Sequence, residues 1–377
     1  MKIGFVLDDT LDNPNGIQQY MLCVGRWLQK HGHEVYYIVG ESHRTDVENM
    51  FSVSTNINVR FNGNKLSMPA PASYKKLRWL LDDLKLDVLH VQAPYSPFLA
   101  GRLIRSVKPS VAVVGTFHIL PYSRASRLGS DILGKINTST AKRFDAMMAV
   151  SAPTQVFAGR YYGFRSIVVA NPFYHDQFSV ARRGKNKPHV VKKIVFLGRL
   201  VTRKGPRELL EAVALLYSTN LTKVKYEVTI AGRGPLLNEL NRFVEKQGLS
   251  KVVTFTGFVE ENKKAELLAS GDLVVFPSTS GESFGISLLE GMAASQGVVL
   301  AGDNLGYACV VADKKQLFNP RDTEAFAKLL ANWLDDDTGR ESMARLQQQY
   351  VRQYDIDEIG PKIVAVYNQA LQKRPRS

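Results

Sequence analysis

Three features of this 377-residue chain predict an α/β fold with two doubly wound parallel sheets. Short, β-branched apolar runs are bounded by Gly, Pro or Asp, as buried strands are. Segments with apolar residues at helical spacing separate these runs, and such alternation is typical of parallel sheets covered on both faces. The whole pattern occurs twice, on either side of a basic segment at 179–193 that we interpret as an exposed linker.

The two halves contain similar numbers of expected strands. In the first half they cover residues 2–7, 34–39, 87–91, 111–115, 146–150 and 166–170. In the second half they cover residues 194–197, 226–231, 252–256, 272–276 and 297–301. We therefore predict one domain at 1–178 and another at 190–355, followed by an amphipathic helix at 356–373.

Composition narrows the class of protein. A hydrophobic content of 45% and a charged content of 22% indicate a soluble globular chain. We expect no signal peptide, because the N-terminal strand lacks a long apolar h-region and a cleavage site. We also expect no membrane span, because no apolar run approaches about 18 residues. Cys23 and Cys309 cannot build a disulfide framework, which favours the cytosol.

The net charge of +14 is distributed unevenly along the chain. Residues 1–190 carry 24 basic and 13 acidic side chains. A basic first half indicates an anionic partner, which could be nucleic acid, anionic lipid headgroups or a phosphorylated acceptor. A solubilising surface charge is the alternative interpretation.

The most informative motif is the segment 281–291, GESFGISLLEG, which follows the expected strand at 272–276. Gly281 and Gly285 let backbone N–H groups turn toward a ligand, and the following helix adds its positive dipole end. This combination suits a diphosphate. Glu282 and Glu290 are hydrogen-bond acceptors when ionised, so they suit sugar hydroxyls. The segment therefore predicts a nucleotide-sugar site.

A second motif, GRLVTRKG at 198–205, follows the expected strand at 194–197. Arg199 and Lys204 would lie at the end of that strand. A guanidinium fork and a compact ammonium suit the two phosphates of a diphosphate leaving group. Alternatively, Arg199 and Lys204 could be solvated loop charges without a ligand. The presence of the 281–291 motif in the same half of the chain favours the binding role.

Three residues of the first half are weaker candidates. Gly16 precedes the first helix and would allow close approach of a phosphate or sugar, although a tight turn explains it equally well. The dinucleotide fingerprint G-x-G-x-x-G is absent. Gln18 could reach an acceptor hydroxyl, or it could be an ordinary exposed helix residue. His118, at the end of a strand, could bond a sugar hydroxyl or the acceptor, or be structural.

We expect no metal and no bound cofactor. The aspartates at 335–337, 355 and 357 lie away from predicted strand ends, where they suit helix surfaces or caps. The sequence holds no clustered set of His and Cys.

With these residues identified, the chain resembles glycosyltransferase family 4, the retaining enzymes of the GT-B fold. The resemblance rests on the Gly16 loop, the Arg199 and Lys204 pair, and Glu282 with Glu290. It implies two Rossmann-like domains facing a central cleft, with the final helix packing back on the first domain. It also implies that Glu282 contacts the sugar, Glu290 the ribose, and the Arg/Lys pair the diphosphate.

The same resemblance implies further donor-binding residues. Backbone N–H groups near Ser283, Phe284, Gly285 and Ile286 would hold phosphate. The segment 257–261 would bind the base, and three residues look like a guanine pocket: Val259, Glu261 and Lys264. The resemblance therefore favours GDP-mannose as the donor, with UDP-glucose second.

Within the family, the chain is most similar to phosphatidylinositol mannosyltransferases, with two departures. The usual Asn-Gly-Val-Asp at the domain junction is Asn-Pro-Phe-Tyr at 171–174, and the segment 303–308 lacks the common Gly-rich form. The family's implied mechanism has no carboxylate nucleophile: the acceptor attacks on the face that the diphosphate leaves, and the leaving phosphate takes its proton.

The segment 73–81, SYKKLRWLL, bears on the acceptor. Its basic and aromatic residues suit an anionic bilayer surface, although its leucines could simply pack on the sheet. Further basic residues follow at 102, 105, 108, 124, 127 and 135. We expect a cytoplasmic enzyme bound peripherally to the membrane, with a lipid or lipid-linked acceptor. The alternatives are a soluble sugar-phosphate acceptor, a 2-epimerase of similar architecture and, as a different class, a nucleic-acid-binding protein, for which no motif is present.

Overall fold

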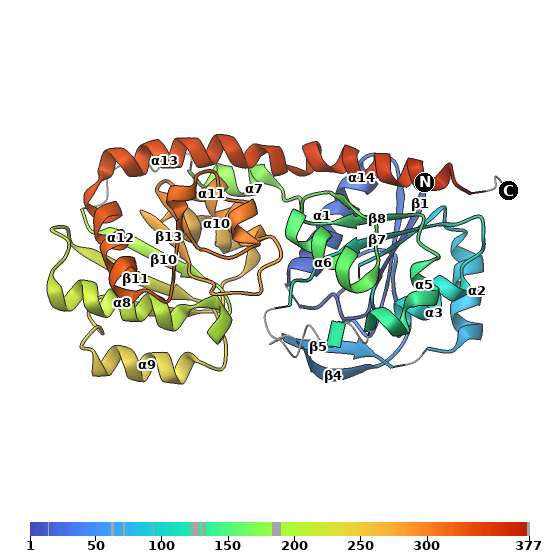
Figure 1. Ribbon diagram of the computed structural model, residues 1–377, viewed down its shortest axis with the longest axis horizontal. Helices are drawn as coiled ribbons and strands as arrows, with labels where there is room; N and C mark the ends of the chain where they lie inside the picture. The colour runs from blue at the N-terminus through green and yellow to red at the C-terminus, as the bar shows by residue number, and fades with distance from the viewer. Residues whose placement is uncertain are drawn as a thin grey trace. The chain divides into compact units, whose positions relative to one another are not determined.

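The computed structural model describes residues 1–13, 15–61, 64–70, 72–92, 94–121, 129–130, 133–182 and 190–374. Arg124, Arg127 and residues 183–189 of the basic segment 179–193 lie outside the described residues. The chain forms two units, which we describe separately (Figure 1). The first unit comprises Met1–Pro172 and Ile356–Ser377, and the second comprises Phe173–Asp355.

The first unit is built on a seven-stranded parallel sheet with the order β3-β2-β1-β6-β7-β8-β9. Its strands are β1 (Lys2–Leu7), β2 (Glu34–Val39), β3 (Met50–Ser52), β6 (Val88–Val91), β7 (Ala112–Phe117), β8 (Ala146–Ala149) and β9 (Ile167–Val168). The central strands are buried on both faces, which explains why they are continuous apolar runs in the sequence.

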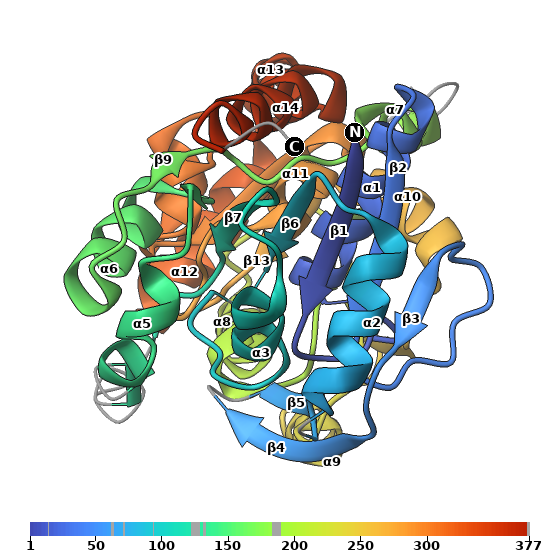
Figure 2. The same cartoon turned by 90° about the vertical axis from the view of Figure 1, so that its right-hand side faces the viewer.

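Helices cover both faces of this sheet (Figure 2). They are α1 (Gly16–Lys30), α2 (Tyr74–Leu84), α3 (Leu99–Ser106), α5 (Thr138–Ala141), α6 (Ala152–Tyr162) and α14 (Ile356–Leu371). Leucines of α2 and α3 pack against β1, β6 and β7 on one face. On the other face α1 and α14 contact each other, and Trp27 Nε1 of α1 donates to Asp357 of α14 at 2.6 Å.

An antiparallel hairpin, β4 (Asn56–Phe61) and β5 (Asn64–Pro69), adds to the first unit and was not predicted.

The second unit is built on a six-stranded parallel sheet with the order β12-β11-β10-β13-β14-β15. Its strands are β10 (Lys192–Leu197), β11 (Tyr226–Ala231), β12 (Val253–Gly257), β13 (Leu273–Phe276), β14 (Val298–Gly302) and β15 (Leu317–Phe318). Its α-helices are α7 (His175–Ser179), α8 (Pro206–Thr219), α9 (Leu237–Lys246), α10 (Glu261–Ala269), α11 (Ile286–Ala294), α12 (Thr323–Asp335) and α13 (Asp337–Tyr350). Among its described residues are also five short 3₁₀ helices: η1 (Val180–Arg182), η2 (Thr202–Lys204), η3 (Tyr307–Cys309), η4 (Lys314–Gln316) and η5 (Val351–Tyr354).

The boundary between the units differs from the predicted one. The first unit ends at Pro172, not at 178, because α7 packs against α10 and α11 of the second unit. Phe173 also forms a bridge with Asp355, and its backbone N–H donates to the Tyr354 carbonyl at 3.2 Å. The departure from the family pattern at 171–174 therefore lies where one unit gives way to the other.

Candidate functional site

In each sheet the strand order reverses beside the strand that comes first in the chain, β1 in one sheet and β10 in the other. In the second unit β10 lies between β11 and β13, so the chain that leaves β10 and the chain that leaves β13 emerge side by side. Such a switch point, at the carboxyl ends of the strands, is where doubly wound sheets bind their ligands. The two most informative sequence motifs, 198–205 and 281–291, follow these two strands.

The two loops are fastened together through their backbones. The Thr279 N–H donates to the Arg203 carbonyl at 3.0 Å. Gly205 has a φ of 71°, and a Cβ at this position would lie 2.0 Å from the Pro277 carbonyl oxygen. Only glycine allows this left-handed turn and this close approach. The side chains that follow β10 therefore reach those that follow β13.

Glu282 is the centre of the resulting cluster. Its Oε1 lies 2.7 Å from Arg203 Nη1, 2.9 Å from Lys204 Nζ and 3.0 Å from Ser278 Oγ. The Glu282 side chain is only 10% exposed, so these donors replace the water that the carboxylate loses. Arg199 faces the same cluster, since its charge interacts with Arg203 and Glu282.

Burial and charge oppose each other in this cluster. Burial of Glu282 raises its pKa, but Lys204 and Arg203 outweigh burial and hold the pKa below its usual value. Burial lowers the pKa of Lys204, and Glu282 offsets only part of this effect because Arg203 and Arg199 repel the ammonium. Three cations surround one carboxylate, so the cluster has an excess of positive charge that can receive an anion.

The loop that leads into α11 has the geometry expected of an anion cradle. Gly281 and Gly285 both have positive φ angles, 74° and 120°. Within the described chain, the backbone N–H groups of Phe284, Gly285 and Ile286 make no hydrogen bond. The buried Phe284 ring packs edge-on against Tyr354 and anchors the loop. These N–H groups and the start of α11 can therefore bind an anion.

A second cluster surrounds Glu290, which lies in α11. Lys264 Nζ of α10 lies 2.9 Å from Glu290 and 2.9 Å from Glu261. Burial raises the pKa of Glu290, and Lys264 offsets part of this shift. Burial lowers the pKa of Lys264, but the two carboxylates outweigh it and raise the pKa. Val259 lies just beyond β12 and is half-buried.

Gly16 and Gln18 lie at the carboxyl edge of the first sheet. Gly16 is exposed and is the first residue of α1. Gln18 is buried, in contrast to an ordinary exposed helix residue, and its Nε2 donates to the Thr10 carbonyl at 2.9 Å and to Asp9 Oδ2 at 3.3 Å. Gln18 therefore joins α1 to the loop that follows β1.

His118 lies at the same edge, just beyond β7. It is buried, and its Nε2 lies 2.8 Å from Oε1 of Gln92, which follows β6. Burial lowers the pKa of His118 to about 3. Asp8, at the end of β1, accepts the Ser96 hydroxyl and the Ala100 N–H. Burial raises its pKa to about 6, and these two hydrogen bonds offset part of the shift.

Nine of the predicted site residues form three groups, and the others lie on the loop into α11 and its first residue (Ser283, Phe284, Gly285 and Ile286) or just beyond β12 (Val259). Arg199, Lys204 and Glu282 come together, Lys264, Glu261 and Glu290 come together, and Gly16, Gln18 and His118 share the carboxyl edge of the first sheet. Sequence analysis did not identify Arg203, Ser278 or Gln92 as functional. For Arg203 the signal was its position next to Lys204, whereas only the fold brings the other two to the site.

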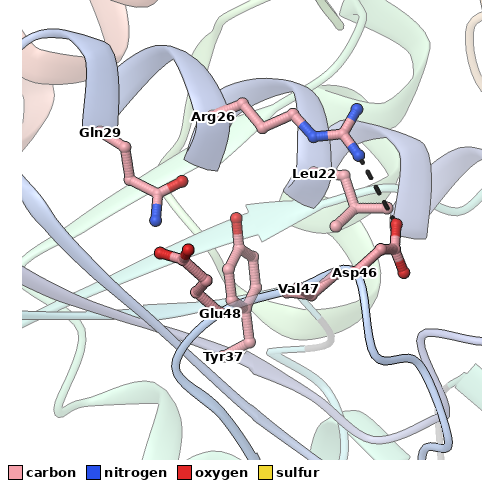
Figure 3. Close-up of a pocket in the computed structure, with 7 residues that line it drawn as sticks. All are labelled: Leu22, Arg26, Gln29, Tyr37, Asp46, Val47 and Glu48. Atoms are coloured by element: carbon pink, nitrogen blue, oxygen red, sulfur yellow. Dashed lines mark ion pairs between the residues drawn. The ribbon is translucent and has the colours of Figure 1, made fainter.

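A cavity of about 360 Å³ lies elsewhere in the first unit (Figure 3). Its lining residues come from α1, β2 and the segment after β2: Leu22, Arg26, Gln29, Tyr37, Asp46, Val47 and Glu48. Arg26 and Asp46 form an ion pair across it at 3.9 Å, and Arg44 also binds Asp46. The cavity contains none of the predicted site residues.

Within the described ranges, no group of three or more His, Cys, Asp or Glu side chains could hold a metal ion. In the same part of the chain no helix is long and apolar enough to cross a membrane.

The fold is the GT-B architecture of glycosyltransferases. Sucrose-phosphate synthase from Thermosynechococcus elongatus has the same fold, with a TM-score of 0.76 at 16% identity over 98% of this chain and 99% of that one. HepE from Anabaena, solved in complex with UDP, gives a TM-score of 0.74 at 18% identity over 98% of this chain and 100% of that one. The predicted class, two parallel sheets with flanking helices, is confirmed.

Two family models match consecutive parts of the chain. The model for Glycosyltransferase Family 4 matches residues 14–177, and the model for Glycosyl transferases group 1 matches residues 178–350. The chain belongs to glycosyltransferase family 4 and is an enzyme of the hexosyltransferase kind. It is 28% identical to the phosphatidyl-myo-inositol mannosyltransferase of Mycobacterium leprae, over 97% of this chain and 96% of that protein.

Proposed function

We propose that this enzyme moves a hexose, with retention of configuration, from a nucleotide diphosphate sugar to a lipid or lipid-linked acceptor at a membrane surface. The observation that carries the proposal is the cluster of Arg199, Arg203 and Lys204 around Glu282. It lies at the switch point of a doubly wound sheet, beside a loop whose N–H groups can bind an anion.

The charges of this cluster suit a diphosphate. Three cations and one carboxylate leave a formal charge of two positive, which matches the two negative charges of a diphosphate that joins a nucleoside and a sugar. Charge-assisted bonds from Arg and Lys are the strongest that a phosphate oxygen can accept. The N–H groups before α11 would complete the binding of the diphosphate.

The carboxylates would bind the hydroxyl groups of the donor. Glu282 would accept from the hexose and Glu290 from the ribose, as the family resemblance implies. The base would lie near Val259, Glu261 and Lys264. We favour GDP-mannose, because full-length relatives are mannosyltransferases. UDP-glucose is the second candidate, because HepE is solved with UDP-glucose.

The reaction requires no carboxylate nucleophile. The bond from the anomeric carbon to the diphosphate oxygen breaks, the acceptor oxygen bonds to the same face of that carbon, and the leaving phosphate takes the acceptor's proton. Arg199, Lys204 and the start of α11 would stabilise the charge that grows on the diphosphate. Gln18 and His118 would bind the acceptor.

Helix α2 supports the proposed membrane acceptor. Its leucines are buried, as expected if they pack on the sheet. Trp79, in contrast, is 68% exposed and is therefore not part of the core. Lys75, Lys76 and Arg78 on this helix are exposed as well. An exposed Trp beside basic residues is suited to the interface of an anionic bilayer.

Thermal unfolding with GDP and with UDP tests the donor. A nucleotide present at 100 times its Kd stabilises the fold by about 2.7 kcal/mol. We expect GDP to raise the unfolding temperature more than UDP, and GDP-mannose to be consumed when a phosphoinositide is added. If the hexose is transferred to a soluble sugar phosphate and not to the lipid, the acceptor is the sugar phosphate. Salt-sensitive binding of DNA without nucleotide binding would contradict the proposal.

A further inference from the structure

Gln92 connects the ends of two neighbouring strands in the first unit. It follows β6 directly, is fully buried, and its Oε1 lies 2.8 Å from His118 Nε2 beyond β7. Among the described residues, Gln92 Nε2 has no hydrogen-bond partner. The amide oxygen of Gln92 therefore accepts a hydrogen bond from His118, whereas its two N–H groups donate to no described residue.

The bond determines where His118 carries its proton. In this orientation of the amide its oxygen accepts, so Nε2 of His118 is the donor and Nδ1 has the free lone pair. The His118 ring is held in place by the Tyr20 ring of α1, edge-on with the centroids 5.0 Å apart. His90, a titratable neighbour of His118, is engaged with Tyr367 and Thr116.

The partner of His118 is also electrically neutral. A carboxylate at position 92 would stabilise an imidazolium, whereas an amide does not. Burial lowers the pKa of His118 to about 3, and no described residue bonds an anion to its ring, so His118 stays neutral throughout the physiological pH range. It can therefore accept a hydrogen bond through Nδ1 without first losing a proton.

The unused N–H groups of Gln92 indicate a ligand. An unpaired buried donor costs about 1–3 kcal/mol, and native proteins contain few of them. This one lies at the carboxyl edge of a doubly wound sheet, where ligands bind. An oxygen atom of a bound molecule would satisfy it.

We propose that Gln92 is a positioning residue of the acceptor site, which keeps His118 in the Nε2–H tautomer and offers its own N–H to a substrate oxygen. Nδ1 of His118 would accept from one hydroxyl while the Gln92 amide donates to a neighbouring oxygen. This pair suits an acceptor with adjacent hydroxyl groups, such as a polyol ring. The inference rests on the proposed function for the identity of the ligand, but not for the tautomer.

Nuclear magnetic resonance of protein labelled with ¹⁵N in the histidine rings tests the tautomer directly. The chain has seven histidines, and a His118→Gln variant identifies the signals of His118. We expect a protonated Nε2 and an unprotonated Nδ1 that do not change between pH 5 and pH 8. A protonated Nδ1, or a titration within this range, would overturn the inference.

Two variants test the role of the amide. Gln92→Glu keeps an acceptor for His118 but adds a charge, so His118 should titrate between pH 5 and pH 8. It also removes the N–H donor, and we expect kcat/KM for the acceptor to fall about tenfold or more. Gln92→Leu removes both functions. If the Leu variant does not fold, the Glu variant and the wild-type spectra still decide.

The readouts separate this inference from the proposed function. Stabilisation by GDP or UDP should be the same in wild type and Gln92→Glu, because the diphosphate cluster lies in the second unit. An unchanged kcat/KM in Gln92→Glu would show that Gln92 does not serve the acceptor. If the wild type transfers no sugar but shows the Nε2–H tautomer, the proposed function is wrong and the inference about the His118 tautomer still holds.

Discussion

A single oxygen atom, Oε1 of Glu282, accepts from three side chains. The Ser278 hydroxyl also lies 3.3 Å from Tyr307 Oη, and since Ser278 gives its proton to Glu282, Tyr307 must donate to Ser278. If a buried carboxylate lost all its partners, the folded protein would be strongly destabilised. Because Glu282 has several, Lys204 can turn toward a diphosphate while Arg203 and Ser278 still hold Glu282.

This sharing predicts that Lys204→Ala is a catalytic defect and not a folding defect. The variant leaves Glu282 bonded to Arg203 but removes a cation that would stabilise the departing diphosphate. Loss of one such group typically lowers the rate about 10²–10³-fold. We expect kcat to fall by this factor while the KM for the donor rises much less, as measured by steady-state kinetics.

Lys328→Ala is the matched control for this prediction. Lys328 is an exposed lysine of the same unit, paired with Glu324 within α12. It should leave kcat, KM and the unfolding temperature unchanged. Equal turnover in Lys204→Ala and wild type would remove Lys204 from the mechanism.

At the scale of single residues, the sequence predicts the charged motifs and not all of their partners. Arg199, Lys204 and Glu282 were recognisable because they follow strands and have a chemistry suited to diphosphates and sugars. Arg203 lies beside Lys204 but was given no role, because a short loop does not disclose which of its side chains turns inward. Ser278 reaches Glu282 only because β10 and β13 are neighbours, which is a property of the folded sheet.

Between elements, Asp8 links β1 to α3. It follows β1 and accepts the N–H of Ala100 in the first turn of α3 at 2.7 Å. Burial raises its pKa to about 6 from 3.8, an effect that the Ser96 hydroxyl and the Ala100 N–H only partly offset. Between these two values the folded chain binds more protons than the unfolded chain, so the free energy of unfolding rises as the pH falls.

This linkage predicts a pH-dependent difference between wild type and Asp8→Asn. From pH 7 to pH 5 the wild type should gain about 1 kcal/mol of stability that the Asn variant does not gain. The Asn side chain can still accept from Ala100, so the variant is expected to fold. Denaturant unfolding of both proteins at the two pH values provides the measurement. Parallel changes in the two proteins would contradict a raised pKa at Asp8.

Helix α2 predicts a specific response of membrane binding to charge. A variant with Lys75→Gln, Lys76→Gln and Arg78→Gln removes three exposed cations from the helix that carries Trp79. Each cation near an anionic surface contributes about 1 kcal/mol, so binding to phosphatidylserine vesicles should weaken roughly 100-fold. Vesicle flotation at constant salt measures the change.

An equal loss of charge elsewhere is the control for α2. Arg242 and Lys246 of α9 and the nearby Lys251 are exposed cations of the second unit. Their replacement by Gln changes the net charge by the same amount and should leave flotation almost unchanged. Equal effects of the two triple variants would mean that net charge, and not α2, attracts the vesicle.

Elements were predictable where their patterns are long and buried. The strands β1, β2 and β11 have the same bounds as predicted, because both flanks of each run carry a clear change of composition. The strands β3, β9 and β15 have only two or three residues, and such pieces carry no periodicity. β3 and β15 were missed, and β9 was expected to be longer than it is.

For the whole molecule, the repetition of one pattern in the sequence was sufficient to predict two α/β units. The first unit was predicted to end at 178 but ends at Pro172. The difference arises because α7 is short and its packing against α10 and α11 leaves no local pattern in the sequence. Both units place candidate site residues at the switch points of their sheets, Gln18 and His118 in the first and the cluster around Glu282 in the second. On the proposed function, the second unit binds the diphosphate of the donor and the basic first unit binds the acceptor.

This division predicts where a nucleotide protects the backbone from hydrogen exchange. A nucleotide that binds the cluster of Arg203, Lys204 and Glu282 should slow exchange at residues 198–205 and 277–290, because these loops carry its ligands and are fastened by the bond between Thr279 and Arg203. Exchange at 116–121 in the first unit should not change with nucleotide alone and should slow only when an acceptor is added. Mass spectrometry of the exchanged peptides provides the measurement, and Lys204→Ala should reduce the nucleotide-dependent protection. Protection confined to the first unit would contradict the assignment of the donor to the second.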